Sequence, residues 1–165
     1  MFVPAEDFVV SYGASDLTTC ERATHIMKRT TNEIRKLQVS GFYRDIELGA
    51  PSPDVDRIEE KYNRLTGDSA SYEMDSRHTI LEMQVNLDLA GFEDEENGEQ
   101  TGIALPYVVS IDAGSREILS IRRNWYEGDD LKTKREHFVH YQYIPGLGFY
   151  GFGLYPLIVT GKQRQ

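Results

Sequence analysis

Residues 81–89 have the sequence LEMQVNLDL, in which apolar and polar residues alternate without interruption. Successive side chains of a β-strand point to opposite faces, so this alternation predicts a strand with one buried face and one solvated face. The apolar face would consist of Leu81, Met83, Val85, Leu87 and Leu89. This stretch divides the chain, because helical patterns precede it and strand patterns follow it.

Two apolar runs follow that strand, at residues 103–111 and 117–123. They flank the turn-forming sequence Asp112-Ala113-Gly114-Ser115 and therefore predict a β-hairpin. Pro106 has no backbone N–H, which favours an edge strand or a bulge for the first of the two strands. Residues 137–144 predict one further strand.

Helical patterns precede the alternating stretch. Thr18 and Glu21 have the spacing of a capping box, in which two side chains satisfy free N–H groups at a helix start. The apolar residues that follow recur at helical spacing and predict one long helix that ends at Gly41: Ala23, Ile26, Met27, Thr30, Ile34 and Leu37. Ser52 and Pro53 predict the start of a second helix, with an apolar stripe of Val55, Ile58, Tyr62 and Leu65.

Short strands are predicted on either side of the first helix, at residues 8–10 and 42–48. Helices thus dominate the first half of the chain and antiparallel strands the second half. This order predicts an α+β fold with N-terminal helices packed on a mainly antiparallel β-sheet. The length of 165 residues favours one domain.

The composition restricts the classes of function. The formal net charge is −9, which disfavours tight binding to nucleic acid because that binding depends on phosphate neutralisation. Cys20 is the only cysteine, so an internal disulfide is impossible, and we expect its side chain to be buried on the first helix. The sequence has no apolar run near the roughly 20 residues that span a bilayer, so no membrane partner is predicted.

One glycine pattern resembles a dinucleotide-binding loop. Gly146, Gly148 and Gly151 have the spacing G-x-G-x-x-G. Such a loop must open a helix whose first turn holds the pyrophosphate, and Gly153 and Pro156 interrupt the helix that would be required. No cofactor is therefore predicted.

Patterns for metal binding and catalysis are incomplete. His137 and His140 are three residues apart, so on a strand they point to opposite faces and cannot share an ion. The acidic residues 93–99 predict a solvated hairpin loop, because an EF-hand alignment places Ala104 where a bidentate glutamate is required. The sequence also lacks a G-x-S-x-G nucleophile elbow. We therefore predict neither catalytic residues nor a metal site.

Three stretches carry a resemblance to a known family. They lie at Val3–Val10 followed by Cys20–His25, at Leu105–Val109 with Ile118–Trp125, and at Phe138–Tyr141 running into Pro145–Leu154. In their order and approximate spacing these stretches resemble blocks of the portal proteins of tailed bacteriophages and related prophages. The run of glycines and aromatic residues in the third stretch is the most specific.

The resemblance covers about Val3 to Ile158. It implies a wing-like α+β domain over residues 1–158 and a short polar tail at residues 159–165. Portal proteins form dodecameric rings at one capsid vertex, through which double-stranded DNA passes without being held tightly. The implied partners are other portal subunits, capsid or scaffold protein, the packaging terminase and the head–tail connector. The implied location is the virion, and the host bacterial cytoplasm during assembly.

Family members continue into stem and clip segments, so we expect this chain to be a fragment. In the family the glycine-rich run leads into the stem. Its large side chains would anchor a turn, either in the chain's own core or against a neighbouring subunit: Phe149, Tyr150, Phe152 and Leu154.

Cyclic rings use heterologous interfaces, so each subunit must carry two different complementary patches. The basic patch is predicted to contain Arg122, Arg123, Lys132, Lys134 and Arg135, and to face the acidic residues 93–99 of a neighbour. Two alternatives remain open. One is a stand-alone assembly or partner-binding domain of a degenerate prophage, and the other is a metal-dependent hydrolase that uses the histidines and carboxylates.

Overall fold

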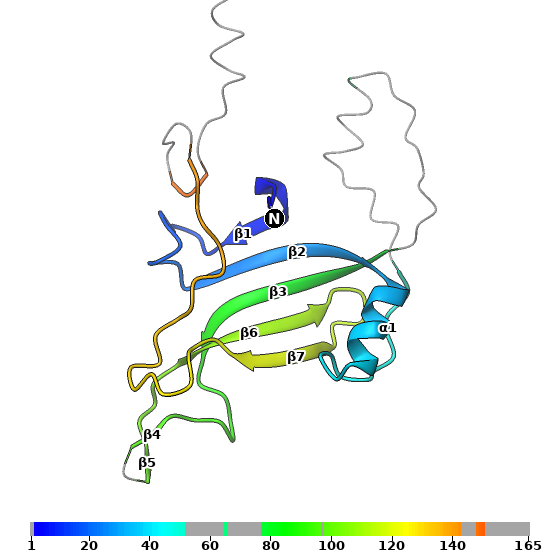
Figure 1. Cartoon of the computed structure of the whole chain (residues 1–165). Helices are drawn as coiled ribbons and strands as arrows, with labels where there is room; N and C mark the ends of the chain where they lie inside the picture. The colour runs from blue at the N-terminus through cyan, green and yellow to red at the C-terminus, as the bar shows by residue number, and fades with distance from the viewer. Residues whose placement is uncertain (1, 52–64, 66–76, 97, 143–147, 151–165) are drawn as a thin grey trace, which may run out of the picture. The chain divides into compact units, whose positions relative to one another are not determined.

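The structure is a computed structural model that describes residues 2–51, 65, 77–96, 98–142 and 148–150 (Figure 1). Five strands form one sheet in the order β1-β2-β3-β6-β7, and β4 and β5 form a separate two-stranded sheet. The elements with described bounds are the 3₁₀-helix η1 (Ala5–Asp7), β1 (Phe8–Val10), β2 (Arg22–Thr30), the α-helix α1 (Thr31–Val39), β3 (Arg77–Leu87), β4 (Glu95–Glu96), β5 (Glu99–Gln100), β6 (Leu105–Asp112) and β7 (Ile118–Arg123).

The five-stranded sheet is mainly antiparallel, as the sequence predicts. β1 and β2 pair antiparallel, with Phe8 opposite His25. β6 and β7 form the predicted hairpin: the Asp112 N–H donates to the Glu117 carbonyl at the turn, and the Asn124 N–H donates to the Pro106 carbonyl at the open end. The strand at residues 8–10 and the strand that contains most of residues 81–89 are confirmed.

The chain divides into two compact units. Unit 1 is drawn from Met1–His25, Met83–Val108 and Arg122–Gln165, and unit 2 from Ile26–Glu82 and Val109–Ile121. Each unit contains a hydrophobic core.

The core of unit 1 is aromatic. Phe8, Cys20, Ala23 and Phe149 are buried together. The Phe138 ring meets Phe8 edge-on, with 4.8 Å between the ring centroids. Cys20 is buried as predicted, but it precedes β2 instead of lying on a helix.

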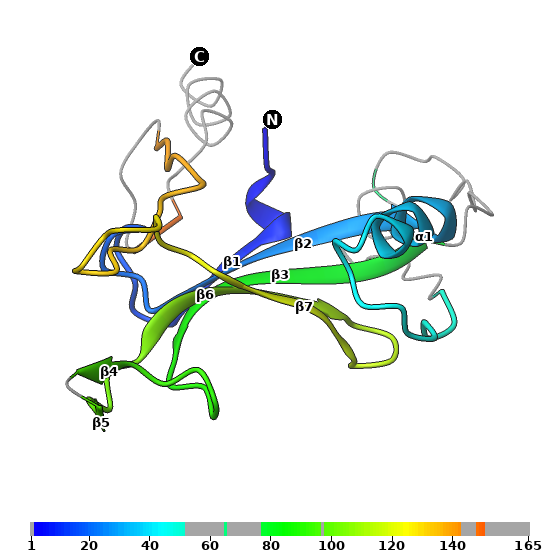
Figure 2. The ribbon, with the colours of Figure 1, turned by 60° about the horizontal axis from the view of Figure 1, so that its bottom comes forward.

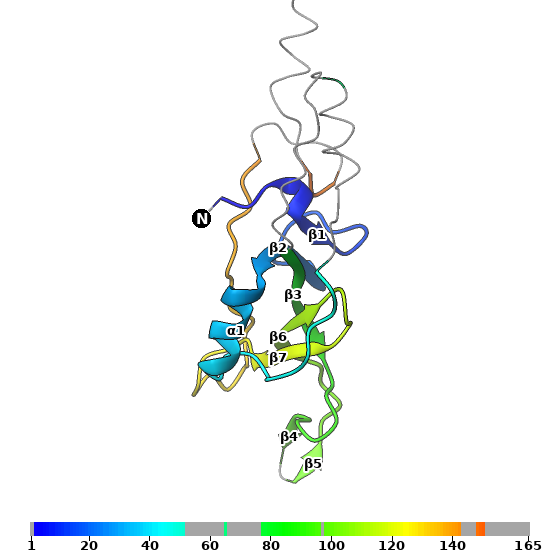
Figure 3. The same cartoon turned by 90° about the vertical axis from the view of Figure 1, so that its right-hand side faces the viewer.

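The core of unit 2 forms where α1 packs on strands (Figure 3). Ile34 of α1 is fully buried against Ile80 of β3 and Leu119 of β7, and Tyr43 closes the cluster. Burying an apolar side chain of this size contributes about 1.5–3 kcal/mol. The aliphatic face of α1 therefore holds the helix in place.

The predicted long helix is wrong over its first half, because residues Arg22–Thr30 form β2. Ala23, Thr24 and His25 are buried in succession, which a strand between two neighbours can achieve and an amphipathic surface helix cannot. The expectation of several N-terminal helices on the sheet is not confirmed, since α1 is the one α-helix whose bounds the described residues define.

α1 begins and ends with strong local signals. The Thr30 hydroxyl accepts from the Glu33 N–H, and the Glu33 carboxylate accepts from the Thr30 N–H, which completes a capping box. At the other end the Phe42 N–H donates to the Leu37 carbonyl, and Gly41 takes a positive φ of 74°. This is the Schellman arrangement, so the predicted stop at Gly41 is confirmed.

The strand predicted at residues 42–48 is wrong. The Gln38 side chain donates to the carbonyls of Arg44 and Ile46, and the Arg44 N–H donates to the Leu119 carbonyl. The backbone groups of Arg44 and Ile46 thus bond to the Gln38 side chain and to one carbonyl of β7, and residues 44–46 form no strand ladder.

The strand predicted at residues 137–144 is also wrong, because residues 137–142 are irregular. Residues 143 and 144 lie outside the described residues. The segment is held by side chains instead, for example by the Gln142 amide, which donates to the Phe149 carbonyl.

Pro106 lies in an interior strand, so the expectation of an edge strand is wrong. It is the second residue of β6, where a missing N–H removes one ladder bond near the strand end. The prediction of which face of β3 is buried is also wrong. His78, Ile80 and Gln84 are buried on one face, whereas Leu81 and Met83 on the other are half-buried.

The second predicted helix, which starts at Ser52 and Pro53, lies outside the described residues except for Leu65. Leu65 is helical and 79% exposed.

Candidate interaction surface

Arg122 and Arg123 are the last two residues of β7, an edge strand. Arg123 is exposed and Arg122 is half-buried. The Arg123 guanidinium lies over the Trp125 ring, 5.8 Å from its centroid, and Trp125 meets the buried Tyr107 edge-on. This stacking limits the motion of Arg123 while leaving its charge accessible.

Phe149 and Tyr150 belong to the aromatic core of unit 1. Phe149 is buried and stacks on the His140 ring, with 4.0 Å between the centroids. The Tyr150 hydroxyl donates to the Phe8 carbonyl at 2.7 Å, and its side chain is partly exposed. The large side chains of this glycine-rich run were expected to anchor a turn either in the chain's own core or against a neighbouring subunit. The structure places Phe149 in the chain's own core. Phe152 and Leu154 lie outside the described residues.

The other predicted basic residues have partners inside unit 1. Lys134 donates to the Leu17 carbonyl at 2.9 Å. The Arg135 guanidinium lies 4.4 Å from the centroid of the Tyr126 ring. Lys132 forms an ion pair with Asp94. Part of the charge complementarity expected between neighbours is therefore found within one chain.

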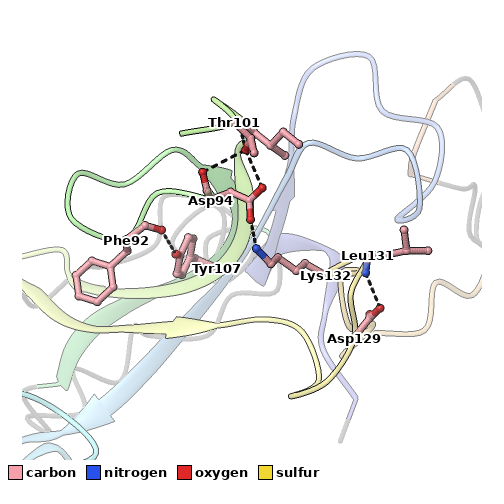
Figure 4. A network of polar contacts seen from close by, with 8 residues as sticks. Phe92, Asp94, Thr101, Tyr107, Asp129, Leu131 and Lys132 are labelled. Carbon is pink, nitrogen blue, oxygen red and sulfur yellow. Dashed lines mark hydrogen bonds and ion pairs between the residues drawn. The ribbon is translucent and has the colours of Figure 1, made fainter. Parts of the chain in front are cut away.

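Figure 4 shows the network around that ion pair. The Thr101 hydroxyl donates to the other Asp94 carboxylate oxygen at 2.7 Å, and the Thr101 N–H donates to the Asp94 carbonyl. The Tyr107 hydroxyl donates to the Phe92 carbonyl at 3.3 Å. The Asp94 side chain is 13% exposed, so its charge is stabilised by Lys132 and Thr101 more than by water.

Figure 2 shows the β4–β5 hairpin, and the network lies at its base because Asp94 directly precedes β4 and Thr101 directly follows β5. Glu95 pairs with Gln100 across this short hairpin, and the side chains of Glu95 and Glu99 are exposed. The predicted acidic hairpin loop at residues 93–99 is confirmed over the described residues. It presents exposed negative charge in unit 1, as Arg123 presents exposed positive charge.

The histidines take structural positions. His137 Nε2 lies 2.7 Å from Asn124 Oδ1, and because an amide oxygen only accepts, His137 Nε2 carries the proton. His140 stacks on Phe149. Within the described residues, no group of three histidine, cysteine or acidic side chains is placed to hold a metal ion. No helix in that part of the chain has the length and apolar character needed to cross a membrane.

The chain was compared with known proteins at the level of families, curated sequences and solved structures. No family model, no curated protein and no solved structure matches it.

Asp112 is the most unusual polar residue of unit 2, and sequence reasoning gave it no role beyond the turn. Its side chain is fully buried. One carboxylate oxygen accepts from the Ser115 hydroxyl, the Ser115 N–H and the Gly49 N–H, at 2.8, 3.0 and 3.1 Å. The other oxygen has no partner among the described residues. The turn sequence was the available signal, since aspartate commonly accepts from nearby backbone in turns.

The pKa of Asp112 reflects opposing effects. Burial raises it, and the hydrogen bonds from Ser115 and from the Gly49 backbone lower it by more, so that the pKa of Asp112 lies below its ordinary value. Asp112 therefore stays ionised and clamps residue 49 to the β6–β7 turn.

Unit 2 also contains a groove of about 450 Å³. It is lined by residues of α1, by Ile46, by residues 48–51 and by His78, whose Nε2 lies 3.0 Å from the Thr31 hydroxyl. Its floor is mostly apolar. No local sequence pattern signals this groove, because its walls come from segments far apart in the chain.

Proposed function

We propose that the chain is a structural part of a tailed-phage portal ring, which contributes contacts to neighbouring subunits and to capsid or scaffold protein and carries out no chemistry. The supporting observation is the position that each of the three portal-like stretches takes in the fold. The first forms β1 and the start of β2, the second forms the β6–β7 hairpin, and the third supplies Phe138 and Phe149, which pack on Phe8 of the first. Residues that carry the resemblance thus lie in strands and in the aromatic core of unit 1, which are structural positions.

The proposal also covers the domain organisation, the partners and the location of the protein. It comprises a wing-like domain over residues 1–158 with N-terminal helices on the sheet, and a polar tail at residues 159–165. The terminase and head–tail connector would engage the full-length protein, and DNA would pass the ring without tight binding. The location would be the virion, after assembly in the bacterial cytoplasm.

The two charged surfaces of unit 1 suggest how neighbours would meet. A heterologous interface requires two different patches on each subunit. Exposed Glu95 and Glu99 on the hairpin provide one, and Arg122 and Arg123 at the end of β7 provide the other. Contacts between exposed charges depend strongly on salt, because the Debye length falls from about 10 Å at 0.1 M to about 3 Å at 1 M.

Sedimentation velocity tests this proposal. We expect the chain to self-associate as its concentration rises, and to dissociate in high salt. The double variant Arg122→Glu/Arg123→Glu should be monomeric, and so should Glu95→Arg/Glu99→Arg. A mixture of the two should form heterodimers, because each supplies the charge that the other has lost.

The control is Arg116→Glu/Lys36→Glu, which makes the same change in net charge as Arg122→Glu/Arg123→Glu at two exposed residues outside both patches. It should associate like the unmodified chain. A chain that stays monomeric at every concentration, with no association in the mixture, would contradict the ring proposal and favour the stand-alone partner-binding domain.

A further inference from the structure

The β4–β5 hairpin is bounded by two glycines in unusual backbone conformations. Gly91 has a φ of 84° and Gly102 a φ of 69°, which L residues rarely adopt. A Cβ placed on either glycine would meet no atom within 4 Å. The segment between them, residues 92–101, is called the arm below. Its residue 97 lies outside the described residues.

The arm is closed at its own base. The Thr101 N–H donates to the Asp94 carbonyl at 2.9 Å, and the Thr101 hydroxyl donates to the Asp94 carboxylate at 2.7 Å. Beyond them Glu95 pairs with Gln100 and Glu96 with Glu99. These bonds lie within the arm, so they persist if the arm rotates as one body about its two glycines.

The Phe92 N–H donates to the Leu89 carbonyl and the Ile103 N–H to the Thr101 hydroxyl, each bond lying beside one of the two glycines. Two further contacts among the described residues hold the arm against the rest of unit 1 (Figure 4). One is the Lys132–Asp94 ion pair, in which the side chains are 32% and 13% exposed. The other is the 3.3 Å hydrogen bond from the Tyr107 hydroxyl to the Phe92 carbonyl. The ion pair reaches across from a different segment, the turn at residues 129–132.

The turn that presents Lys132 is unusual in its own right. Lys132 has a φ of 48°, a region in which glycine or asparagine is favoured over lysine. Asp129 fixes this turn, because its carboxylate accepts from the N–H groups of Leu131 and Thr133 and its carbonyl accepts from the Lys132 N–H. The backbone gives no reason for lysine at this position, so the reason lies in the side chain.

We infer that the arm is a hinged element that Lys132 latches to the turn at residues 129–132. Opening separates the Lys132 ammonium from Asp94 and turns the arm about Gly91 and Gly102. The exposed Glu95 and Glu99 move with it, so the latch sets the orientation of the acidic patch. That consequence rests on the proposed function, whereas the latch itself does not.

Pulsed electron–electron spin resonance on the full chain tests the latch. Spin labels are attached at Glu99→Cys on the arm and Asp130→Cys on the turn, in a Cys20→Ser background. The unmodified Lys132 should give one narrow distance distribution. Lys132→Gly keeps the positive φ and removes the ammonium, so we expect a longer-distance population roughly fivefold larger, the factor that corresponds to losing a modest ion pair.

Two comparisons make the result decisive. Lys36→Ala, at an exposed residue of α1, removes one positive charge and should leave the distances unchanged. Asp94→Asn removes the other charge of the pair and should enlarge the longer-distance population as Lys132→Gly does. If Lys132→Gly fails to fold, Asp94→Asn decides alone.

Distributions for Lys132→Gly and Asp94→Asn that match the distribution of the unmodified protein would overturn the latch. The measurement is made on dilute monomer, so it is independent of the association experiment. If Lys132 holds the arm but the chain never self-associates, this inference stands and the proposed function is rejected.

Discussion

At the scale of single residues, Asp112 shows how one buried carboxylate can join distant parts of a chain. It has no cationic partner among its described contacts, and the partial positive charges of N–H and O–H groups stabilise it instead. Because the folded-state pKa is lower than the ordinary value of 3.8, the stabilisation is present above that pH and is lost as pH falls through the folded-state pKa.

Asp112→Asn should therefore be destabilising at neutral pH, by about 1–3 kcal/mol, because an amide cannot replace a carboxylate that accepts three hydrogen bonds. The difference from the unmodified protein should shrink when the free energy of unfolding in urea is measured at about pH 2.5 instead of pH 7. Asp88→Asn, at an exposed aspartate, is the control and should have little effect at either pH. A penalty that is equal at both pH values would show that the ionised form is not what stabilises the fold.

Two glycines near Asp112 provide a matched pair. A Cβ on Gly49 would lie 2.6 Å from the Ser115 nitrogen and 2.8 Å from the Gly114 carbonyl carbon, which are both backbone atoms. A Cβ on Gly114 would lie 3.4 Å from the Ala50 carbonyl oxygen, close to an ordinary contact. We expect Gly49→Ala to cost about 1–3 kcal/mol in thermal unfolding experiments and Gly114→Ala to cost much less. Similar costs at both positions would mean that close backbone approach is not what requires Gly49.

At the scale of elements, α1 illustrates how a local signal can be genuine and still be assigned to the wrong place. Thr18 and Glu21 have the capping-box spacing, but Asp16 organises that segment by accepting from the Thr19 N–H and hydroxyl. The same hydrogen bonds lower the pKa of Asp16. The capping box that operates is at Thr30 and Glu33, after a strand that the sequence pattern does not separate from a helix.

Thr30→Ala should remove this cap and destabilise the protein by about 1 kcal/mol, because the Glu33 N–H loses its acceptor. Circular dichroism during urea unfolding measures the effect. Asn32→Ala, within the same first turn and exposed, should be neutral or slightly stabilising because alanine is the better helix former. If both substitutions had the same effect, the cap would not contribute to stability.

At the scale of the whole molecule, the described residues hold two cores, and the only cysteine of the sequence lies in the first. Cys20 is 6% exposed, and its thiol donates to the Arg22 carbonyl at 2.9 Å. Its reaction with a thiol reagent therefore reports on the opening of unit 1.

Phe149→Ala should increase the reaction rate of Cys20 by at least about tenfold, because removing a buried phenylalanine costs about 3–5 kcal/mol and most of that cost falls on its own core. The rate is followed spectrophotometrically with a disulfide reagent. Leu119→Ala, a truncation in the core of unit 2, is the control and should increase the rate far less. Equal acceleration by both would mean that the two cores open together.

The local sequence was sufficient to predict an element wherever residues close together in the chain decide its conformation. The β6–β7 hairpin follows from two apolar runs around Asp112–Ser115, and the end of α1 follows from Gly41, because turns and caps are closed by hydrogen bonds between residues a few positions apart. The strand at residues 8–10 and the existence of β3 were predicted from a short apolar run and from the alternation of apolar and polar residues. The acidic residues 93–99 were also recognised as a hairpin loop from composition.

Tertiary structure decided what depends on partners from elsewhere in the chain. Arg22–Thr30 is a strand because β1 and β3 lie on either side of it, and its sequence spacing alone fits a helix equally well. Residues 42–48 are irregular because the Gln38 amide and the edge of β7 satisfy their backbone. The Asp112 clamp and the Lys132–Asp94 pair join residues far apart in sequence, so no local pattern could reveal them.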